Sequence, residues 1–180
     1  MKFSKKEITD LFKAWVAISI AFGIVLNEDN FLFSFLLAGI TVGVGFLLHE
    51  LGHKLVAQRF GYWAEFQSFD PMLLLAIAMS FFGFVFAAPG AVMFHGSRYR
   101  KDEVGKIGVA GPVVNLVLAL VFLFVPGALG QYGFMINSWL ALFNMIPVSM
   151  FDGAKIWQWN KIIYFVVTGI AFVLVFVVSY

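Results

Sequence analysis

The sequence has no cysteine and few charged residues. Only 12% of its 180 residues are charged and 62% are hydrophobic, whereas a soluble domain has about 25% charged and about 45–50% apolar residues. The absence of cysteine excludes disulfide bonds and cysteine-ligated metal sites, so a metal ion would have to be held by His, Asp or Glu. The surplus of apolar residues excludes a water-soluble fold and predicts a polytopic membrane protein.

Apolar runs separated by short polar segments predict the membrane spans. Five full transmembrane helices are expected, over residues 11–26, 31–60, 107–125, 134–151 and 162–180. Between the second and third spans, residues 62–97 include alternating aromatic segments, which predict a small membrane-associated β-sheet in a re-entrant hairpin. The backbone of such a hairpin must pair its strands or pack against protein. The fold expected is a membrane all-α bundle with this small sheet, in one domain over residues 1–180.

The placement of Lys and Arg predicts how the chain is oriented. Cytoplasmic ends of membrane spans carry an excess of these residues. If residues 71–86 dip into the membrane and return, all 12 Lys and Arg residues lie on the cytoplasmic side. A single crossing would put the basic cluster at 98–106 outside. The sequence therefore predicts a re-entrant hairpin and a multi-pass protein of the plasma membrane with a cytoplasmic N-terminus.

The second span contains the motif His49-Glu50-Leu51-Gly52-His53. Histidines at i and i+4 share one helix face and can bind one metal ion, and Glu50 beside them can act as general base on a water at that metal. Ionisable residues are costly inside a membrane span, so their presence indicates function. The alternative is that Glu50 pairs with a histidine or with Lys54 as a structural contact. Helix rise places the motif inside the bilayer, nearer the cytoplasm.

A third metal ligand is needed, and Asp152 is the first choice. It ends an apolar span on the cytoplasmic side, where the histidines also lie, although its position also suits a helix cap or an interfacial charge. A single crossing by residues 71–86 would instead put Asp152 on the side opposite His53. The charge bias and the need for a third ligand near the histidines therefore independently favour the re-entrant hairpin. The other candidates for the third ligand are Asp70, Asp102, Glu103, Glu65 and His95. His95 is expected to be an interfacial residue rather than a ligand.

Two asparagines are candidate substrate-binding residues. Pro147, between Asn144 and Asp152, breaks the helical hydrogen-bond ladder, and such a break is tolerated in lipid only beside protein or a wet cavity. An unwound stretch there would lower Asp152 toward the metal and let Asn144 donate to a substrate carbonyl. Asn115, in Gly111-Pro112-Val113-Val114-Asn115, is placed to face the same cavity. The alternative is an interhelical hydrogen bond for Asn144 and helix packing for Asn115.

Three separated patterns together resemble the site-2 protease family of intramembrane metalloproteases. They are His49-Glu50-x-x-His53, Gly111-x-x-x-Asn115 and Asn144-x-x-Pro147-x-x-x-x-Asp152-Gly153, and the resemblance covers a core at residues 31–153. It implies one zinc ion bound by His49, His53 and Asp152, with Glu50 activating water and Asn144 holding the scissile carbonyl. It also implies that an unwound substrate joins the β region as an added strand, at residues 84–95.

The function expected is a zinc-dependent endopeptidase that cuts peptide bonds within transmembrane segments of other membrane proteins. Its partners would be the lipid bilayer and a substrate with a transmembrane helix, with no nucleic acid. The alternative is a non-proteolytic metal-binding membrane protein or transporter. A transporter should carry several intramembrane carboxylates, and apart from Glu50 and Asp152 the spans have almost none. A membrane zinc peptidase that cuts soluble or prenylated peptides is disfavoured by Asp152 as third ligand.

Overall fold

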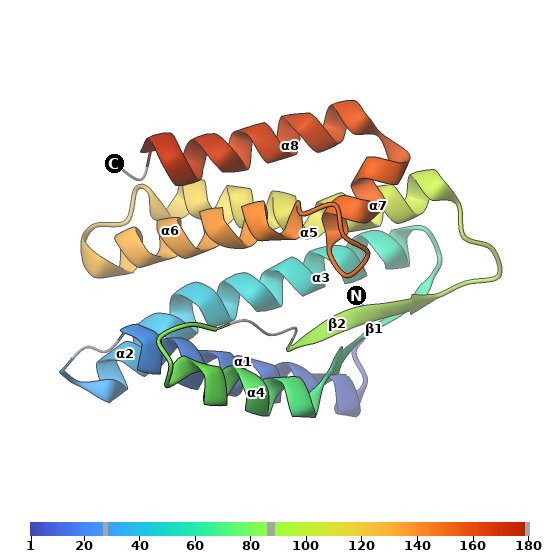
Figure 1. Cartoon of the computed structure of the whole chain (residues 1–180). Helices are drawn as coiled ribbons and strands as arrows, with labels where there is room; N and C mark the ends of the chain where they lie inside the picture. The colour runs from blue at the N-terminus through green and yellow to red at the C-terminus, as the bar shows by residue number, and fades with distance from the viewer. Residues whose placement is uncertain (27–28, 86–88, 179–180) are drawn as a thin grey trace.

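The computed structural model describes residues 1–26, 29–85 and 89–178 and is mostly helical, with one two-stranded sheet at its edge (Figure 1). Its first half comprises α1 (Lys5–Leu26), α2 (Phe31–Ala38), the π-helical turn η1 (Gly39–Gly43), α3 (Val44–Arg59), β1 (Trp63–Ser68) and α4 (Asp70–Ser80). Its second half comprises β2 (Gly90–His95), α5 (Lys101–Phe122), α6 (Gly127–Asn144), α7 (Asp152–Trp159), α8 (Lys161–Val173) and the π-helical turn η2 (Leu174–Val178).

The segments α2, η1 and α3 form one long apolar helix, Phe31–Arg59, which agrees with the helix predicted over residues 31–60 and is long enough to cross a membrane. The small residues of η1 let α1 approach closely. A side chain at Gly43 would lie 2.7 Å from the indole ring of Trp15, whose Nε1–H donates to the carbonyl of Gly39 at 3.0 Å. This packing holds the helix that carries the two histidines against α1.

The sheet confirms the prediction of two short strands between the second and third spans. Strands β1 and β2 are antiparallel, in a register that pairs Trp63 with His95 and Ser68 with Gly90. Ser68 and Gly90 therefore lie at the same end of the sheet, and α4, which follows β1 in the sequence, lies beside α1 (Figure 1). Of the expected substrate edge at 84–95, only Gly90–His95 is strand, and residues 86–88 lie outside the described part of the chain.

Helix α5 is central because it packs against α3, α6 and α7. On one side lies a core with members from α1, α3, the sheet, α4 and α5, including Phe66 and Ile107. On the other side lies a core formed by α5, α6, α7, α8 and η2, including Met145 and Ile156. The site described below lies at the junction of α3, α5 and α7, between these two cores.

Within the described residues, four helices are long and apolar enough to cross a membrane: Lys5–Leu26, Phe31–Arg59, Lys101–Phe122 and Lys161–Val178. The segment predicted to span at 134–151 has different bounds, because α6 begins at Gly127, within the expected turn, and ends at Asn144. Residues 145–151 are not helical. Pro147 accounts for this break, since proline lacks an N–H and disfavours helical geometry in the residue before it.

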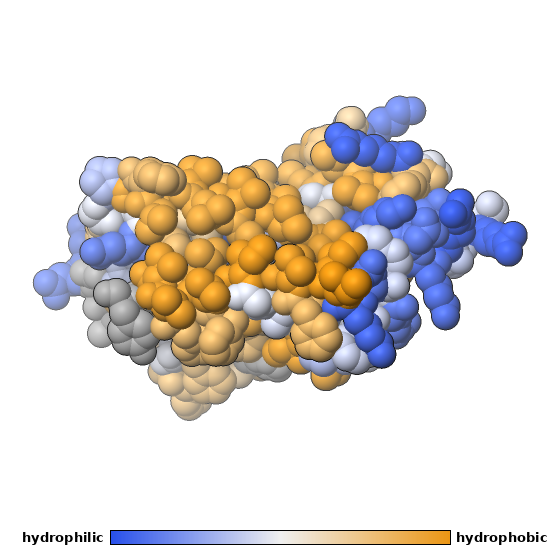
Figure 2. Space-filling model, turned by 90° about the horizontal axis from the view of Figure 1, so that it is seen from above, coloured by the Kyte–Doolittle hydropathy of each residue, from blue (hydrophilic) through white to orange (hydrophobic). Residues whose placement is uncertain are grey.

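The surface divides into an apolar body and a polar end. Figure 2 shows a broad hydrophobic area over most of the visible face, with hydrophilic residues gathered mainly at the end where α7 and the start of α5 lie in Figure 1. Large apolar side chains are exposed on several helices and in the turn after α5, among them Leu74, Ile162 and Phe124. Exposed apolar residues in such number suit lipid rather than water as the surrounding solvent.

Candidate metal centre

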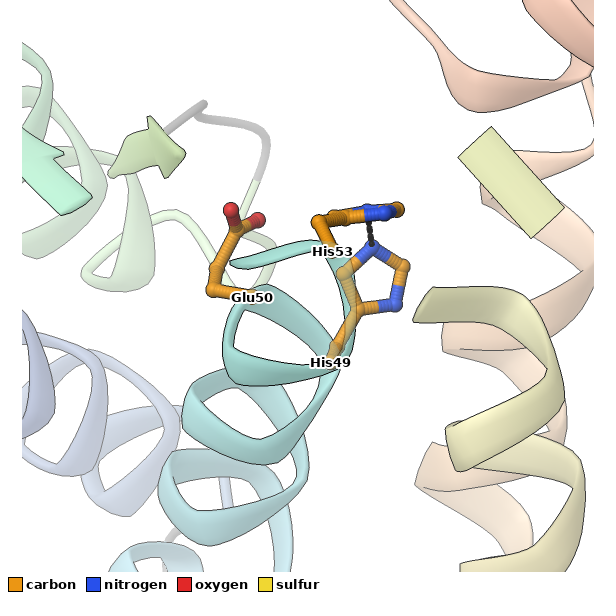
Figure 3. A group of neighbouring side chains, drawn as sticks. All are labelled: His49, Glu50 and His53. Carbon is orange, nitrogen blue, oxygen red and sulfur yellow. Dashed lines mark hydrogen bonds between the residues drawn. The ribbon is translucent and has the colours of Figure 1, made fainter. Parts of the chain in front are cut away.

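His49 and His53 lie one turn apart on α3, and their rings point toward one another (Figure 3). Their Nε2 atoms are 3.0 Å apart, and both side chains are buried. Glu50 projects from the same turn in another direction, yet metal-ligating atoms of these three residues all lie within 4.8 Å of one another. The i, i+4 spacing thus produces a compact buried group of two imidazoles and one carboxylate.

Asp152 completes this group from the opposite side. It is the first residue of α7, which follows the non-helical stretch 145–151. Its Oδ2 lies 3.2 Å from Nε2 of His49 and 2.9 Å from Nε2 of His53. Zinc binds nitrogen and oxygen ligands at about 2.0–2.2 Å. Because each side of this triangle is shorter than twice that distance, one ion could contact all three atoms.

Both imidazoles are oriented for metal binding by hydrogen bonds at their other nitrogen. Nδ1 of His53 donates to the carbonyl oxygen of Ile107 at 2.7 Å, and Nδ1 of His49 donates to Oδ1 of Asn115 at 2.6 Å. A carbonyl can only accept, so Nδ1 of His53 carries a proton, and in the neutral ring Nε2 keeps the lone pair that a metal ion needs. Such partners fix the ring orientation and tautomer of metal-binding histidines.

Gly111 leaves the space that an ion would need. A Cβ atom at this position of α5 would lie 2.5 Å from Nε2 of both His49 and His53. The glycine therefore opens a small cradle directly beside the two ligand atoms. This space and the chemistry of the donor atoms fit a zinc ion held by His49, His53 and Asp152.

The carboxylate of Glu50 is held by the sheet rather than by a basic side chain. Its Oε2 accepts a hydrogen bond of 2.9 Å from the backbone N–H of Val92 on β2. Lys54, the basic partner considered in the alternative reading, is fully buried and forms its ion pair with Glu7 of α1 instead. Glu50 therefore stays beside the histidines without a salt bridge to Lys54.

Asp152 has a second partner that the sequence did not suggest. Nζ of Lys155, one turn along α7, donates to Oδ1 of Asp152 at 2.9 Å. The two carboxylate oxygens of Asp152 therefore have different partners: Oδ1 faces the ammonium group and Oδ2 faces the histidines. This arrangement favours Asp152 as a ligand through Oδ2 alone.

The other sequence candidates lie in different surroundings. Nδ2 of Asn144 donates to the carbonyl of Leu140 on its own helix at 2.9 Å. Asn115 is fully buried and contacts His49 directly, as described above. The remaining third-ligand candidates have other partners: Asp70 with Lys13, Asp102 with Lys106, Glu103 with Tyr62, Glu65 with Ser4, and His95 stacked on Trp63.

The chain is similar to proteins named as zinc metalloproteases. A protein of Methanocaldococcus jannaschii, "Putative zinc metalloprotease MJ0611", is 41% identical over 177 residues, covering 92% of this chain and 91% of that protein. The chain belongs to this zinc metalloprotease family. "Zinc metalloprotease MJ0392" of the same organism is 28% identical, over 83% of this chain and 40% of its own length. "Putative zinc metalloprotease YwhC" of Bacillus subtilis is 27% identical, over 65% of both chains.

No protein-family model matches the chain, and no solved structure does. The names of the relatives, together with the buried His49–Glu50–His53 group, imply zinc as the metal of this metalloprotease.

Two residues near the site, Lys155 and Asn137, were not predicted from the sequence. Asn137 is a fully buried amide in apolar α6, and the cost of polar groups inside a membrane was the signal that could have found it.

Proposed function

We propose that this metalloprotease is an intramembrane endopeptidase of the site-2 protease type, which cuts transmembrane segments of other membrane proteins. The observation that carries the proposal is the triangle formed by Nε2 of His49, Nε2 of His53 and Oδ2 of Asp152, with sides of 3.0, 3.2 and 2.9 Å. Its two histidines lie on a helix that is long and apolar enough to cross a membrane. A hydrolytic centre at this depth can reach peptide bonds that a soluble protease cannot.

One zinc ion, when bound, would lower the pKa of a coordinated water and polarise the scissile carbonyl. Glu50 is placed to accept a proton from the attacking water and would return it to the leaving amine. Asn144 donates to the oxygen on which negative charge develops, which requires its amide to leave the carbonyl of Leu140. Asn115 contributes by holding His49. The reaction needs no covalent intermediate with the enzyme.

The substrate would bind in extended form along β2. The outer edge of β1 is already occupied, because the N–H of Phe66 donates to Glu7 at 2.9 Å and that of Ser68 to Asp10 at 3.5 Å. On the outer edge of β2 the N–H of Val92 donates to Glu50, so a substrate strand at this edge would take that N–H from Glu50 or pair with the backbone groups beside it. An unwound transmembrane segment can pair there through its backbone, so recognition would depend on local unwinding more than on sequence.

The protein would lie in the plasma membrane with its active site toward the cytoplasm. The re-entrant hairpin 62–97 then puts all 12 Lys and Arg residues on the cytoplasmic side, as the positive-inside rule requires. The polar end in Figure 2 agrees with this arrangement, since α7 and the start of α5, which follows the basic residues Arg98 and Arg100, lie at that end in Figure 1. Cleaved cytoplasmic fragments would be released on this side.

The test uses the full chain reconstituted into liposomes with a panel of single-span substrates, and it measures zinc content and cleavage together. We expect the wild type to bind about one zinc per chain and to cleave at least one substrate within its span. Glu50→Gln should keep the zinc and lose cleavage, and Asp152→Ala should lose both. Asp102→Asn, which changes a surface carboxylate, should match the wild type in both measurements.

Two results would overturn the proposal. One is cleavage by Glu50→Gln at the wild-type rate, which would exclude its role as general base. The other is zinc uptake into the liposomes without cleavage of any substrate, which would identify a transporter.

A further inference from the structure

Asn137 of α6 is fully buried and contacts the residue that holds His49. Its Oδ1 accepts a hydrogen bond of 2.9 Å from Nδ2 of Asn115, and its own Nδ2 donates to the carbonyl of Gly133 at 2.9 Å. Asn115 in turn joins His49 at 2.6 Å. Three buried side chains from α3, α5 and α6 thus form one hydrogen-bonded chain that ends at the proposed metal ligand.

The direction of this chain follows from two backbone carbonyls. The carbonyl of Gly133 can only accept, so the nitrogen of Asn137 must face it and the oxygen must face Asn115. The carbonyl of Gly45 likewise accepts from Nδ2 of Asn115 at 3.2 Å. Both hydrogens of the Asn115 amide are then used, one for Gly45 and one for Asn137.

The oxygen of Asn115 therefore remains for His49 and acts as an acceptor. Nδ1 of His49 must then carry a proton, and in the neutral ring Nε2 keeps the lone pair that faces His53 and Asp152. If the Asn115 amide turned over, its NH₂ group would face Nδ1, and the proton would move to Nε2, where it would block the metal. The acceptor of Asn137 opposes that rotation.

The backbone leaves room for Asn137 at a glycine. A Cβ atom at Gly45 would lie 2.5 Å from Oδ1 of Asn137, so only glycine allows α3 to approach this amide. Gly45 thus provides both the close approach and one of the two fixed acceptors. The contact between α3 and the amide of Asn137 therefore depends on a glycine at position 45.

We infer that Asn137 is a positioning residue for the metal centre, which fixes the amide of Asn115 so that His49 presents Nε2 to zinc. The inference rests on the proposed zinc site and extends it to a residue of α6. Partners beyond the ligands of a metal site typically contribute 10–100-fold in metal affinity. Since Asn137 acts through one intermediate, we expect Asn137→Leu to weaken zinc binding about tenfold.

The experiment measures zinc affinity of the full chain in detergent by competition with a chelator, in a cycle of wild type, Asn115→Leu, Asn137→Leu and the double variant. If Asn137 acts through Asn115, Asn137→Leu weakens zinc binding in the wild type and has no further effect once Asn115 is leucine. A structural role would instead give a similar loss in both backgrounds. Asn137→Asp keeps an oxygen acceptor toward Asn115 and should retain zinc affinity.

The matched control is Ser138→Ala, because Ser138 is the next residue of α6, is equally buried and donates to the carbonyl of Phe134 on its own helix. It should leave zinc affinity unchanged. If Asn137→Leu does not fold, as judged by melting of the zinc-free protein, Asn137→Ala replaces it in the cycle. Unchanged affinity in a folded variant, or equal losses in both backgrounds, would overturn the inference.

The test of Asn137 and the test of the proposed function can fail independently. If the wild type cleaves its substrate while Asn137→Leu keeps full zinc affinity, the function stands and the positioning role fails. If zinc binding follows the cycle but no substrate is cleaved, the positioning role stands and the protease proposal fails.

Discussion

The backbone N–H of Val92 and the carboxylate of Glu50 are joined by a hydrogen bond of 2.9 Å. This bond links the outer edge of β2 to the helix that carries both histidines. It uses only Oε2, so the other oxygen of Glu50 remains available for a proton from water. The proposed general base is therefore oriented by the same strand edge along which we propose that the substrate binds.

Val92→Pro removes this N–H and should lower kcat about tenfold with zinc content unchanged. A hydrogen bond to a charged group contributes about 1.5–3 kcal/mol, and losing it lets Glu50 leave its position. Proline is tolerated on an edge strand where the N–H points away from the partner strand. Val92→Ala is the matched control, since it keeps the N–H and loses only apolar contacts. Equal kcat in the two variants, measured on a reconstituted substrate, would show that the bond does not serve catalysis.

Gly111→Ala should fill the cradle beside the histidines. The new Cβ would lie 2.5 Å from both Nε2 atoms, so either the ion is excluded or the rings move away from Asp152. Zinc affinity should fall at least about 100-fold, a loss as large as that of a supporting partner or larger. Helix stability should not fall, because alanine is about 1 kcal/mol better than glycine within a helix.

Gly169→Ala is the control for Gly111→Ala, because a Cβ at Gly169 meets nothing within 4 Å. Zinc affinity of both variants is measured by chelator competition, and their melting is compared without zinc. A Gly111→Ala protein that kept wild-type zinc affinity would refute the placement of the ion beside Gly111.

Glu7→Gln should destabilise the protein by leaving the ammonium group of Lys54 buried without a counter-charge. Lys54 and Glu7 are almost completely inaccessible to solvent, with exposures of 0% and 1%. Breaking such a pair costs about 3–5 kcal/mol, which corresponds to a melting temperature lower by about 10 °C for a chain of this size. Adding Lys54→Met removes the unpaired charge and should restore most of the loss. If the double variant melts no higher than Glu7→Gln, the cost does not arise from the buried charge.

The local features of the site were predictable because they depend on spacing along one helix or on one residue type. The i, i+4 spacing alone places His49 and His53 on one face of α3. Pro147 predicts an interruption of the helix whatever the surrounding fold, and Asp152 follows that interruption. The alternating aromatic segments likewise predicted the strands that became β1 and β2.

Features that depend on packing between distant segments were not predictable. Gly127, Gly130 and Gly133 are typical of a turn, yet only Gly127 has a positive φ, of 75°, and it begins α6. Gly133 instead lets the ring of Phe122 pack against α6. The amide chain from Asn137 to His49 joins three helices, and no pattern within one segment encodes such a contact.

The absence of native cysteine allows the orientation of the chain to be tested directly. Ser97→Cys introduces a thiol at an exposed position after β2, beside the basic residues Arg98 and Arg100. Asp29→Cys introduces one at an exposed position between α1 and α2, at the other end of the molecule (Figure 1). In intact cells, an impermeant maleimide added outside should label Asp29→Cys and should label Ser97→Cys only after the membrane is opened.

Because the re-entrant hairpin alone keeps residues 98–106 inside, labelling of both thiols from outside would mean that residues 71–86 cross the membrane once. Asp152 would then emerge on the side opposite His53, and the three-ligand zinc site could not form.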